Sequence, residues 1–221
     1  EDALEKYKKG EKSNKVFILP QEKLKQIPSW PLVYWISDRI RSLFSKNEEL
    51  DKYAKTCAGL QTSNNFRFLR FWWEVGKNNI YFNAKDIIDT KNLIYKWFPY
   101  MKGGEVNKWY GNQEYVVNWS RNGKQIRKFR EYLNTINTPM GIANTDKYFK
   151  EGCTYTFLTV SNLSVRYMPI GFIFDIAGSS IFTEKTNVFL LIAILNSKVS
   201  TYLIKLLNPT VNYQVGDIAR L

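Results

Sequence analysis

The chain has 221 residues, of which 44% are hydrophobic and 24% charged, so it can bury a core and is not a disordered tail. Its 32 Lys and Arg residues outnumber its 20 Asp and Glu residues, and this excess of +12 favours a polyanionic partner. The absence of histidine excludes Ser-His-Asp and Cys-His catalysis and every metal site that needs imidazole.

The two ends and the cysteines indicate where the protein works. The first 14 residues are charged and lack an apolar signal core, and the longest apolar run, Val188 to Leu195, is too short to cross a bilayer. The widely spaced Cys57 and Cys153 fit two buried thiols in a reducing compartment better than a disulfide. We expect a soluble cytoplasmic protein. The missing initiator methionine and the abrupt end predict a piece of a longer chain.

Residues 1–58 are expected to form a helical connector. Ser29-Trp30-Pro31 is a helix start signal, and apolar residues then recur at helical spacing up to Phe44. A second, short helix is expected from Glu48 to Ala58, with Gly59 as its C-terminal cap.

From Gly59 onward the pattern predicts strands. The aromatic-rich segment Phe66 to Val75 alternates and ends at Gly76. Further strands are expected at Leu93 to Tyr100, Glu114 to Trp119, Thr154 to Val160, Ser164 to Tyr167 and Phe172 to Ile176.

The remaining segments mix helix and strand. Asn122-Gly123 predicts a tight turn, followed by a basic helix over Lys124 to Leu133. Val188 to Leu207 has the length of a buried helix, and a last short strand is expected around Tyr213 to Ile218. The predicted fold is α/β (α+β): a mixed-sheet domain over residues 59–221, preceded by the helical connector.

Charge is concentrated in one segment. Residues 91–130 contain nine basic and two acidic residues, a net charge of +7, whereas residues 151–221 carry +1. Aromatic side chains from Tyr95 to Phe129 alternate with these cations. Nucleic-acid surfaces combine cations for phosphates with rings for bases or sugars, so this segment is the candidate binding surface.

No catalytic set is recognisable in the sequence. Asp89-Thr90-Lys91 matches only half of a metal-dependent nuclease motif, and a solvated loop explains it better. Asn208-Pro209-Thr210 is only superficially similar to the Asn-Pro-Pro-Tyr tetrapeptide of amine methyltransferases. Lys102-Gly103-Gly104 lacks the spacing of a P-loop. It fits a flexible turn and a close backbone approach to phosphate equally well.

Several motifs, in order along nearly the whole chain, resemble one family. They are Pro28-Ser29-Trp30-Pro31, Tyr34-Trp35-Ile36-Ser37-Asp38, Gly59-Leu60-Gln61-Thr62, Asn65, Phe68-Leu69-Arg70, Trp97-Phe98-Pro99-Tyr100, Lys102-Gly103-Gly104, Lys108-Trp109-Tyr110-Gly111-Asn112, Tyr115-Val116-Val117-Asn118-Trp119, Phe174-Asp175, Ala177-Gly178-Ser179-Ser180, Leu195-Asn196-Ser197-Lys198, Leu207-Asn208-Pro209-Thr210 and Gln214-Val215-Gly216-Asp217-Ile218. The chain is similar to the PglX-like adenine-specific DNA methyltransferases of bacteriophage exclusion (BREX) systems, relatives of the type IIG restriction-modification enzymes.

This resemblance implies a parent protein that transfers a methyl group from S-adenosylmethionine to N6 of adenine in a short DNA site of a prokaryotic host. The methyltransferase half has no counterpart in this chain. The chain resembles the target recognition domain instead, so recognition of double-stranded DNA is assigned to it and catalysis to the missing domain in cis. Other BREX proteins, or an acidic phage inhibitor, are further expected partners.

The candidate DNA contacts follow from the basic segment and the polar clusters. The expected phosphate contacts are Lys102, Lys108, Lys124, Arg127, Lys128 and Arg130. The expected base contacts are Thr62, Asn64, Asn65, Arg70, Asn112, Arg121 and Arg166. A solvated helix face, a polar turn and core packing are the structural alternatives for these residues. Two functions compete with DNA recognition: a protein-interaction domain, which requires an exposed apolar patch around Trp30, Trp35, Trp72 or Trp73, and an RNA-binding module.

Overall fold

The computed structural model describes residues 2–11, 15–91, 94–134, 141–159 and 162–221. An N-terminal arm carries three helices: α1 (Asp2–Lys8), α2 (Gln21–Leu24) and α3 (Asp38–Lys46). The rest of the described chain forms two small sheets with helices packed around them.

The first sheet is antiparallel and has the strand order β1-β8-β5-β6. Its strands are β1 (Lys55–Cys57), β8 (Ser180–Phe182), β5 (Gly152–Tyr155) and β6 (Val165–Met168). Strand β1 comes from the start of the chain and pairs with β8, so the sheet joins segments more than 120 residues apart in sequence.

The second sheet is mixed and has the order β2-β4-β3-β7. Its strands are β2 (Leu69–Phe71), β4 (Tyr115–Asn118), β3 (Trp97–Met101) and β7 (Ile173–Phe174). Strand β4 runs antiparallel to both of its neighbours, and β7 runs parallel to β3. Together the two sheets and the helices confirm the α/β class predicted from the sequence.

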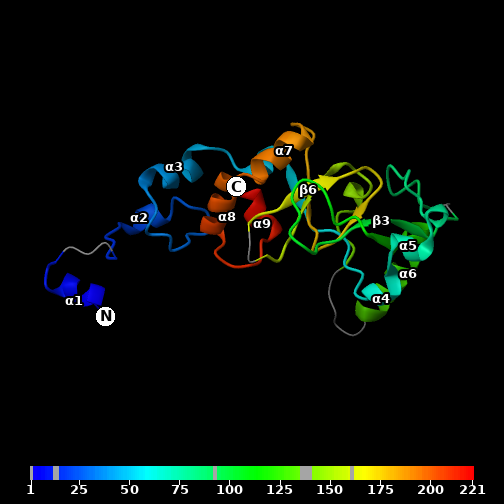
Figure 1. Cartoon of the computed structure of the whole chain (residues 1–221), viewed down its shortest axis with the longest axis horizontal. Coiled ribbons are helices and arrows are strands. Elements are labelled where there is room, and N and C mark those ends of the chain that lie inside the picture. Colours follow the sequence, from blue (N-terminus) through cyan, green and yellow to red (C-terminus); the bar gives the residue numbers. More distant parts are fainter. Residues whose placement is uncertain (1, 12–14, 92–93, 135–140, 160–161) are drawn as a thin grey trace.

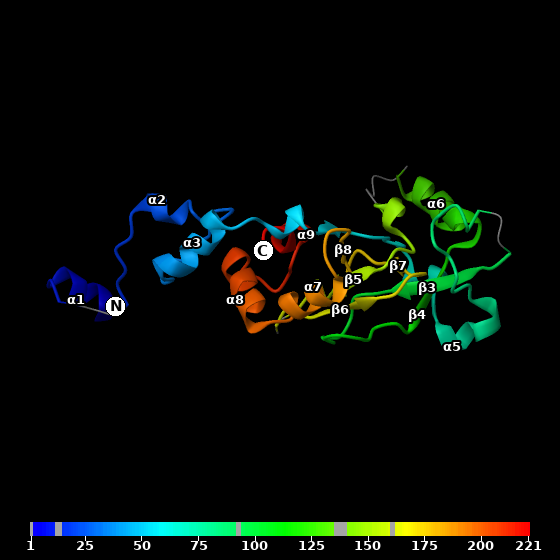
Figure 2. The same ribbon diagram turned by 90° about the horizontal axis from the view of Figure 1, so that it is seen from above.

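The other helices lie at two positions along the molecule. They are α4 (Asn65–Phe68), α5 (Trp72–Val75), α6 (Ser120–Asn134), α7 (Val188–Leu195), α8 (Lys198–Leu207) and α9 (Val215–Ala219), with short 3₁₀ turns at Leu50–Lys52, Lys77–Asn79 and Thr145–Lys147. Helices α7–α9 lie between the arm and the sheets, whereas α4–α6 lie at the end farthest from the arm (Figures 1 and 2).

The described residues form two hydrophobic cores, one beside helices α7–α9 and one beside helices α4–α6. The first joins α7–α9 to the first sheet and to the arm residues Ile27, Val33 and Ile36. The second lies around the mixed sheet and includes Trp119 and Ile126 from the α6 region. Each core holds one cysteine, Cys153 in the first and Cys57 in the second, and both are buried free thiols as predicted.

The first predicted helix is shorter than its pattern indicates. It begins at Asp38 rather than near Ser29, because Ser29 and Trp30 adopt left-handed backbone angles with φ of 64° and 52°. The Ser37 hydroxyl accepts a hydrogen bond from the Ile40 amide (3.3 Å) and caps the helix there.

Two further predictions in the first half are wrong. The helix expected at Glu48–Ala58 is a 3₁₀ turn followed by β1, because pairing with β8 overrides the local pattern. The strand expected at Phe66–Val75 is confined to Leu69–Phe71. The Asn64 side chain caps α4, and the Glu74 carboxylate accepts a hydrogen bond from the Phe71 amide at the start of α5.

The long helix expected over Val188–Leu207 is two helices, α7 and α8, bent by 68°. Asn196 stops α7 because its side chain exchanges two hydrogen bonds with the Val165 backbone, at 2.9 and 2.7 Å. Ser197 then caps α8 through the Ser200 amide (3.1 Å). Among the described residues no single helix is long and apolar enough to span a membrane, and α7 with α8 reaches that length only as a bent pair.

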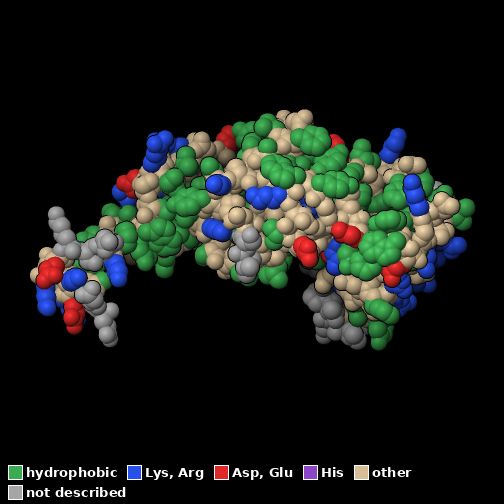
Figure 3. All heavy atoms as spheres, viewed as in Figure 1, with side chains coloured by type: hydrophobic (Ala, Val, Ile, Leu, Met, Phe, Trp, Pro, Cys, Tyr) green, Lys and Arg blue, Asp and Glu red, His purple; other side chains and the backbone are tan. Residues whose placement is uncertain are grey.

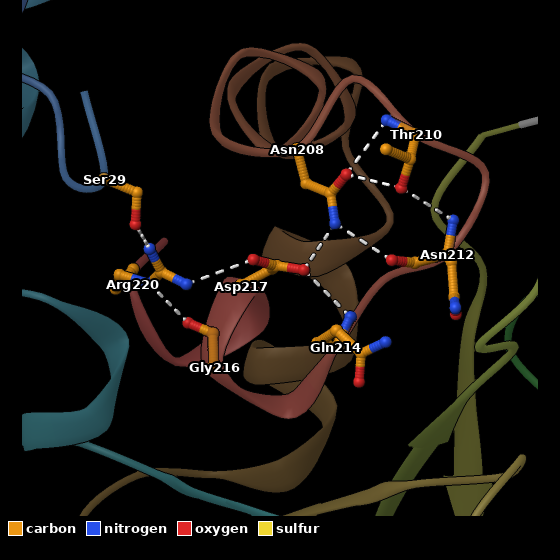
Figure 4. Close-up of polar contacts among 8 residues, drawn as sticks. All are labelled: Ser29, Asn208, Thr210, Asn212, Gln214, Gly216, Asp217 and Arg220. Carbon is orange, nitrogen blue, oxygen red and sulfur yellow. Dashed lines mark hydrogen bonds and ion pairs between the residues drawn. The ribbon is translucent and has the colours of Figure 1, made fainter. Parts of the chain in front are cut away.

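The C-terminal segment is helix α9 rather than the expected strand, and a polar network explains its position (Figure 4). The Asp217 carboxylate accepts hydrogen bonds from the Gln214 amide (2.9 Å) and from Asn208 Nδ2 (2.6 Å). Arg220 pairs with Asp217 and also donates to the Ser29 hydroxyl, so the same network fastens the arm to the domain.

The other predicted strands agree with the structure in position. Those near residues 97–101, 115–118, 165–168 and 173–174 are confirmed, with ends shifted by a few residues, whereas the strand expected at Thr154–Val160 is β5 at Gly152–Tyr155 and shares only Thr154 and Tyr155 with the prediction. Leu93 and Val160, at two of the predicted ends, lie outside the described residues. Strand β8 has no predicted counterpart. The division of the chain into a connector of residues 1–58 and a domain of residues 59–221 stays a prediction.

Candidate nucleic-acid interface

A left-handed turn sets the direction of the basic helix α6. Arg121, Asn122 and Gly123 have φ values of 51°, 56° and 67°, after which the chain continues as a helix. Position 123 requires glycine, because a Cβ there would lie 2.6 Å from the buried Trp119 ring. A left-handed arginine is strained, and such strain is commonly retained where a side chain must be presented in one direction.

The turn and α6 form one wall of a groove of about 860 Å³. The lining residues are Lys91, Ile94, Ser120, Arg121, Lys124, Gln125 and Lys128. Four of these carry a positive charge and none carries a negative charge, and within the described part of the chain no ion pair is recorded for the four cations. Lys and Arg side chains gather over this end of the molecule in Figure 3. A concave surface of this kind concentrates positive potential and attracts polyanions.

A second hollow, of about 340 Å³, adjoins the basic groove and shares Ile94 with it. Its lining combines two amides, two rings and a cation: Asn78, Asn79, Tyr95, Trp97 and Lys96. The Lys96 ammonium lies 5.1 Å from the centre of the Trp97 ring. The mixture of cations and rings predicted for residues 91–130 is therefore present at the surface beside α6.

Arg127 and Arg130 belong to α6 but face the protein. Arg127 Nε donates to the Asn122 carbonyl (2.9 Å), and its guanidinium lies 5.6 Å from the Trp119 ring. Arg130 is buried and donates to the Ser63 hydroxyl. These two arginines hold α6 and its turn in place, so of the five basic residues from 121 to 130 only Arg121, Lys124 and Lys128 line the groove.

The polar segment of residues 62–65 mostly stabilises its own turn. The buried Thr62 hydroxyl donates to Asn65 Oδ1 (2.6 Å), and Asn64 Oδ1 accepts from the Arg67 amide (2.9 Å) as the cap of α4. Asn65 is exposed and lines another groove, of about 540 Å³.

That groove also contains Arg70, Lys102 and the acidic Glu74. Arg70 Nη1 donates to the carbonyls of Phe66 and Leu69, at 2.6 Å each. The Phe66 ring is 90% exposed at the same place. The groove therefore combines both signs of charge with apolar surface, unlike the groove beside α6.

Three candidates in the 102–112 segment are engaged in contacts within the fold. Lys102 forms an ion pair with Asp175 (2.8 Å), whose side chain is only 6% exposed. Lys108 Nζ donates to the Asn196 carbonyl at the end of α7 (2.8 Å). The buried Asn112 side chain donates to the Gly103 and Glu105 carbonyls.

Arg166 lies in the interior. It has no exposed surface, and its Nη1 donates to the Thr156 hydroxyl (2.9 Å) while Nη2 donates to the Lys102 carbonyl (3.4 Å). Burial lowers the pKa of Arg166 from its ordinary value to about 10 because the charged form loses hydration. Because it is buried, its side chain is not accessible to a base edge in this structure.

One glycine from each glycine-rich motif, Gly103 and Gly178, is an internal packing position. A Cβ at Gly103 would lie 2.4 Å from the Ala177 carbonyl oxygen, and one at Gly178 would lie 2.8 Å from the Gly103 nitrogen. Of the two interpretations open for Lys102-Gly103-Gly104, the structure supports an internal turn.

The structure thus brings together only part of the predicted set. Arg121, Lys124 and Lys128 share one groove, Asn65, Arg70 and Lys102 line another, and the remaining candidates are engaged in the fold. Sequence analysis missed Lys91 and Gln125 as groove residues. Lys91 lies 29 residues before Ser120, where α6 begins, and no local pattern in the sequence places it beside that helix. Gln125 lies inside that helix, and a single neutral amide among charged residues gives no signal of binding in the sequence.

The segments that could be compared with methyltransferase motifs do not fit a methyl donor or a reacting amine. Asn208 uses its side chain within the α8–α9 turn, where Oδ1 accepts from the Thr210 amide (2.9 Å) and Nδ2 donates to the Asn212 carbonyl (2.9 Å) (Figure 4). The glycines of the 103–104 turn are packed or bordered by the protein itself. Among the described residues, no group of three or more His, Cys, Asp and Glu side chains is placed to hold a metal ion.

Comparison with known proteins gives a clear result. No protein-family model matches the chain. It is 36% identical over 204 residues, 90% of its length, to the adenine-specific methyltransferase BrxX of Escherichia coli O9:H4 (strain HS). It is 33% identical over 218 residues, 94% of its length, to the adenine-specific methyltransferase PglX of Lacticaseibacillus casei (strain Zhang).

The chain is homologous to a segment of these methyltransferases. It spans 15% of the length of BrxX and 17% of the length of PglX. The resemblance drawn from the motifs is confirmed at the level of homology to PglX-like adenine-specific methyltransferases.

Proposed function

We propose that the chain is the part of an adenine-specific DNA methyltransferase that recognises double-stranded DNA, and that it is not itself catalytic. The observation that carries the proposal is the groove beside α6, with four cations and no carboxylate among its lining residues. Homology to two methyltransferases named as adenine-specific supplies the nature of the polyanion.

Phosphate contacts would come first in such an interface. Lys124 and Lys128 are four residues apart on α6 and both face the groove, so they present two ammonium groups along one wall. Lys91 and Arg121 extend the positive surface. Contacts of this kind position a protein on duplex DNA, and groups that meet base edges supply the specificity.

In the parent protein, recognition of the DNA sequence by this chain would position the target adenine relative to the catalytic groups. The methyl donor, S-adenosylmethionine, and the catalytic groups would belong to the missing domain in cis, into which the base is flipped. The resemblance to PglX-like enzymes assigns the modification to phage exclusion in a prokaryotic cytoplasm. An acidic phage inhibitor would compete with DNA for the same groove.

The test is duplex binding measured by fluorescence anisotropy across a range of salt concentrations. We expect Lys124→Glu with Lys128→Glu to weaken binding at least about tenfold and to lower the log-log salt slope by about 1.8. Lys198→Glu with Lys205→Glu is the matched control. It makes the same change in net charge at two exposed lysines of α8, and we expect it to change the slope far less.

Absence of duplex binding by the wild-type chain at low salt would contradict the proposal. So would equal losses in the two charge-reversal variants, because only net charge would then matter. Preference for single-stranded RNA over duplex DNA in competition would favour the RNA-binding alternative.

A second function, docking of another protein surface, is favoured by helix α7. All eight of its residues are apolar, but only one side faces the core, and Phe189, Leu190 and Ile194 are each more than half exposed. Figure 3 shows hydrophobic side chains spread over this face. A helix that is apolar all round is ordinarily buried.

Because the relatives are about six times longer than the matched segment, the occupant we propose is the rest of the methyltransferase. In the full-length parent, Leu190→Glu with Ile194→Glu is expected to loosen this contact and increase cleavage by limited proteolysis. Ile170→Glu, at another exposed apolar position, is the control. Unchanged proteolysis in the double variant would contradict the docking.

A further inference from the structure

We propose that Gln125 is a specificity-determining residue that presents a hydrogen-bond donor to a base edge in the groove beside α6. This inference rests on the proposed DNA-recognition function. Gln125 lines the groove between Lys124 and Lys128, and it is the one amide side chain among the lining residues in the described part of the chain.

Neighbouring hydrogen bonds determine which way the Gln125 amide points. Asn118 Oδ1 accepts from the Ser120 amide (3.4 Å), so Asn118 turns its Nδ2 toward Gln125. That Nδ2 donates to Gln125 Oε1 (3.0 Å). With Oε1 engaged, Nε2 and its two N–H groups are directed away from Asn118.

The support for this orientation is rigid. Asn118 ends strand β4 and is only 4% exposed, and the left-handed turn at residues 121–123 fixes the start of α6. Gln125 therefore differs from the lysines beside it, whose long side chains are free to follow phosphates. A neutral amide whose oxygen is already hydrogen-bonded is suited to distinguishing one base from another, because its free donor is oriented before DNA binds.

A donor at this position matches some base edges and opposes others. In the major groove N7 and O6 of guanine, N7 of adenine and O4 of thymine are acceptors, whereas cytosine offers the N4 amino donor. We therefore expect one position of the recognised sequence to disfavour cytosine by about tenfold relative to the preferred base.

The experiment is selection of bound duplexes from a randomised library by the 221-residue chain, followed by sequencing. The wild-type chain is expected to enrich an acceptor-bearing base at one position. Gln125→Glu keeps the bond to Asn118 but replaces the donor by an acceptor, so it is expected to shift that position about tenfold toward cytosine. Gln125→Ala should remove the preference there and leave the other positions unchanged.

Asn118→Asp tests the orientation itself, because it leaves Gln125 in place. A carboxylate at position 118 still accepts from Ser120 but can no longer donate, so Gln125 would turn its Nε2 inward and present Oε1 to the groove. The same position of the site is then expected to shift toward a donor-bearing base. If this variant fails to fold, the two Gln125 variants decide the question.

The outcomes separate this inference from the function on which it rests. If the wild-type chain enriches a sequence but neither Gln125 variant changes any position, the inference is overturned and the DNA-recognition function stands. If the chain binds duplexes without any sequence preference, the inference about Gln125 is also overturned, while binding to duplex DNA stands. If the chain binds no duplex, both fail together.

Discussion

The groove beside α6 and the segment of residues 102–112 both take their cations from the basic part of the chain, residues 91–130, but use them differently. In the groove, Lys124 and Lys128 are exposed and have no recorded ion pair within the described chain. In the segment, Lys102 is neutralised by Asp175, and Lys108 donates a hydrogen bond to the carbonyl of Asn196, which follows α7. The comparison shows that cations of one basic segment differ in availability: those with a partner in the fold are engaged, and those without one line the groove.

The largest effect expected within this comparison comes from Gly103. Gly103→Ala would drive a Cβ against the Ala177 carbonyl, and we expect it to lower the free energy of unfolding by about 3 kcal/mol or more. Chemical denaturation measures the change. Gly216→Ala is the control, because its Cβ meets only Arg220 Nη2 at 3.6 Å and alanine is favoured in helices. An unaffected Gly103→Ala variant would show that the segment is not packed as described.

Lys102→Met should separate stability from binding. It leaves the buried Asp175 carboxylate without its cation, and we expect a loss of about 2 kcal/mol in the free energy of unfolding. Under conditions where the variant is folded, DNA affinity is expected to change less than about threefold. Lys102→Met with Asp175→Asn should recover part of the stability. A large loss of affinity in the folded single variant would place Lys102 in the DNA interface after all.

Arg121→Asn should move stability and binding in opposite directions. Asparagine tolerates the left-handed backbone at this position better than arginine does, so we expect a gain of about 0.5–1 kcal/mol in the free energy of unfolding. Loss of one groove cation should also lower the salt slope of DNA binding by about 0.9. Thermal unfolding and anisotropy provide the two measurements. A variant that loses stability would contradict the strain assigned to this turn.

The smallest effect is expected for chemical labelling of the two thiols, whose rates report whether each hydrophobic core stays closed. Burial raises the pKa of Cys57 and of Cys153 above the ordinary value of 9.0, so at pH 8 both are expected to react slowly with a thiol reagent until the protein opens. A raised pKa favours the protonated form in the fold, so this stabilisation is complete below pH 9 and is lost as the pH rises further. Fast labelling of Cys57 alone would reveal a variant whose second core, around the mixed sheet, has loosened.

Local patterns in the sequence predicted the elements of the second half better than those of the first. The turn at Asn122-Gly123 and the basic helix that follows were predictable because glycine, asparagine and the charged face act locally. Strand β1 was not, because its stability depends on pairing with β8, more than 120 residues away. The division of Val188–Leu207 was missed since Asn196 gains its role from the Val165 backbone.

Contacts between residues distant in sequence also limit how much of the candidate site could be predicted. The sequence identifies the basic segment, and from it Arg121, Lys124 and Lys128 meet in the groove. Lys102 and Arg166 carry the same charge, but their partners, Asp175 and Thr156, are distant or buried and are not visible from local spacing. Composition therefore indicates the kind of ligand, whereas the fold decides which cations are free to meet it.

The most direct test compares the salt dependence of duplex binding for two pairs of substitutions, each verified as folded by circular dichroism and by slow labelling of Cys57. Lys124→Met with Lys128→Met removes two groove cations, and Lys102→Met with Lys108→Met removes two that are engaged in the fold. We predict that the log-log slope falls by about 1.8 in the first pair and stays within about 0.5 of the wild-type slope in the second. Equal slopes in the two pairs, or a larger fall in the second, would contradict the assignment of DNA recognition to the groove beside α6.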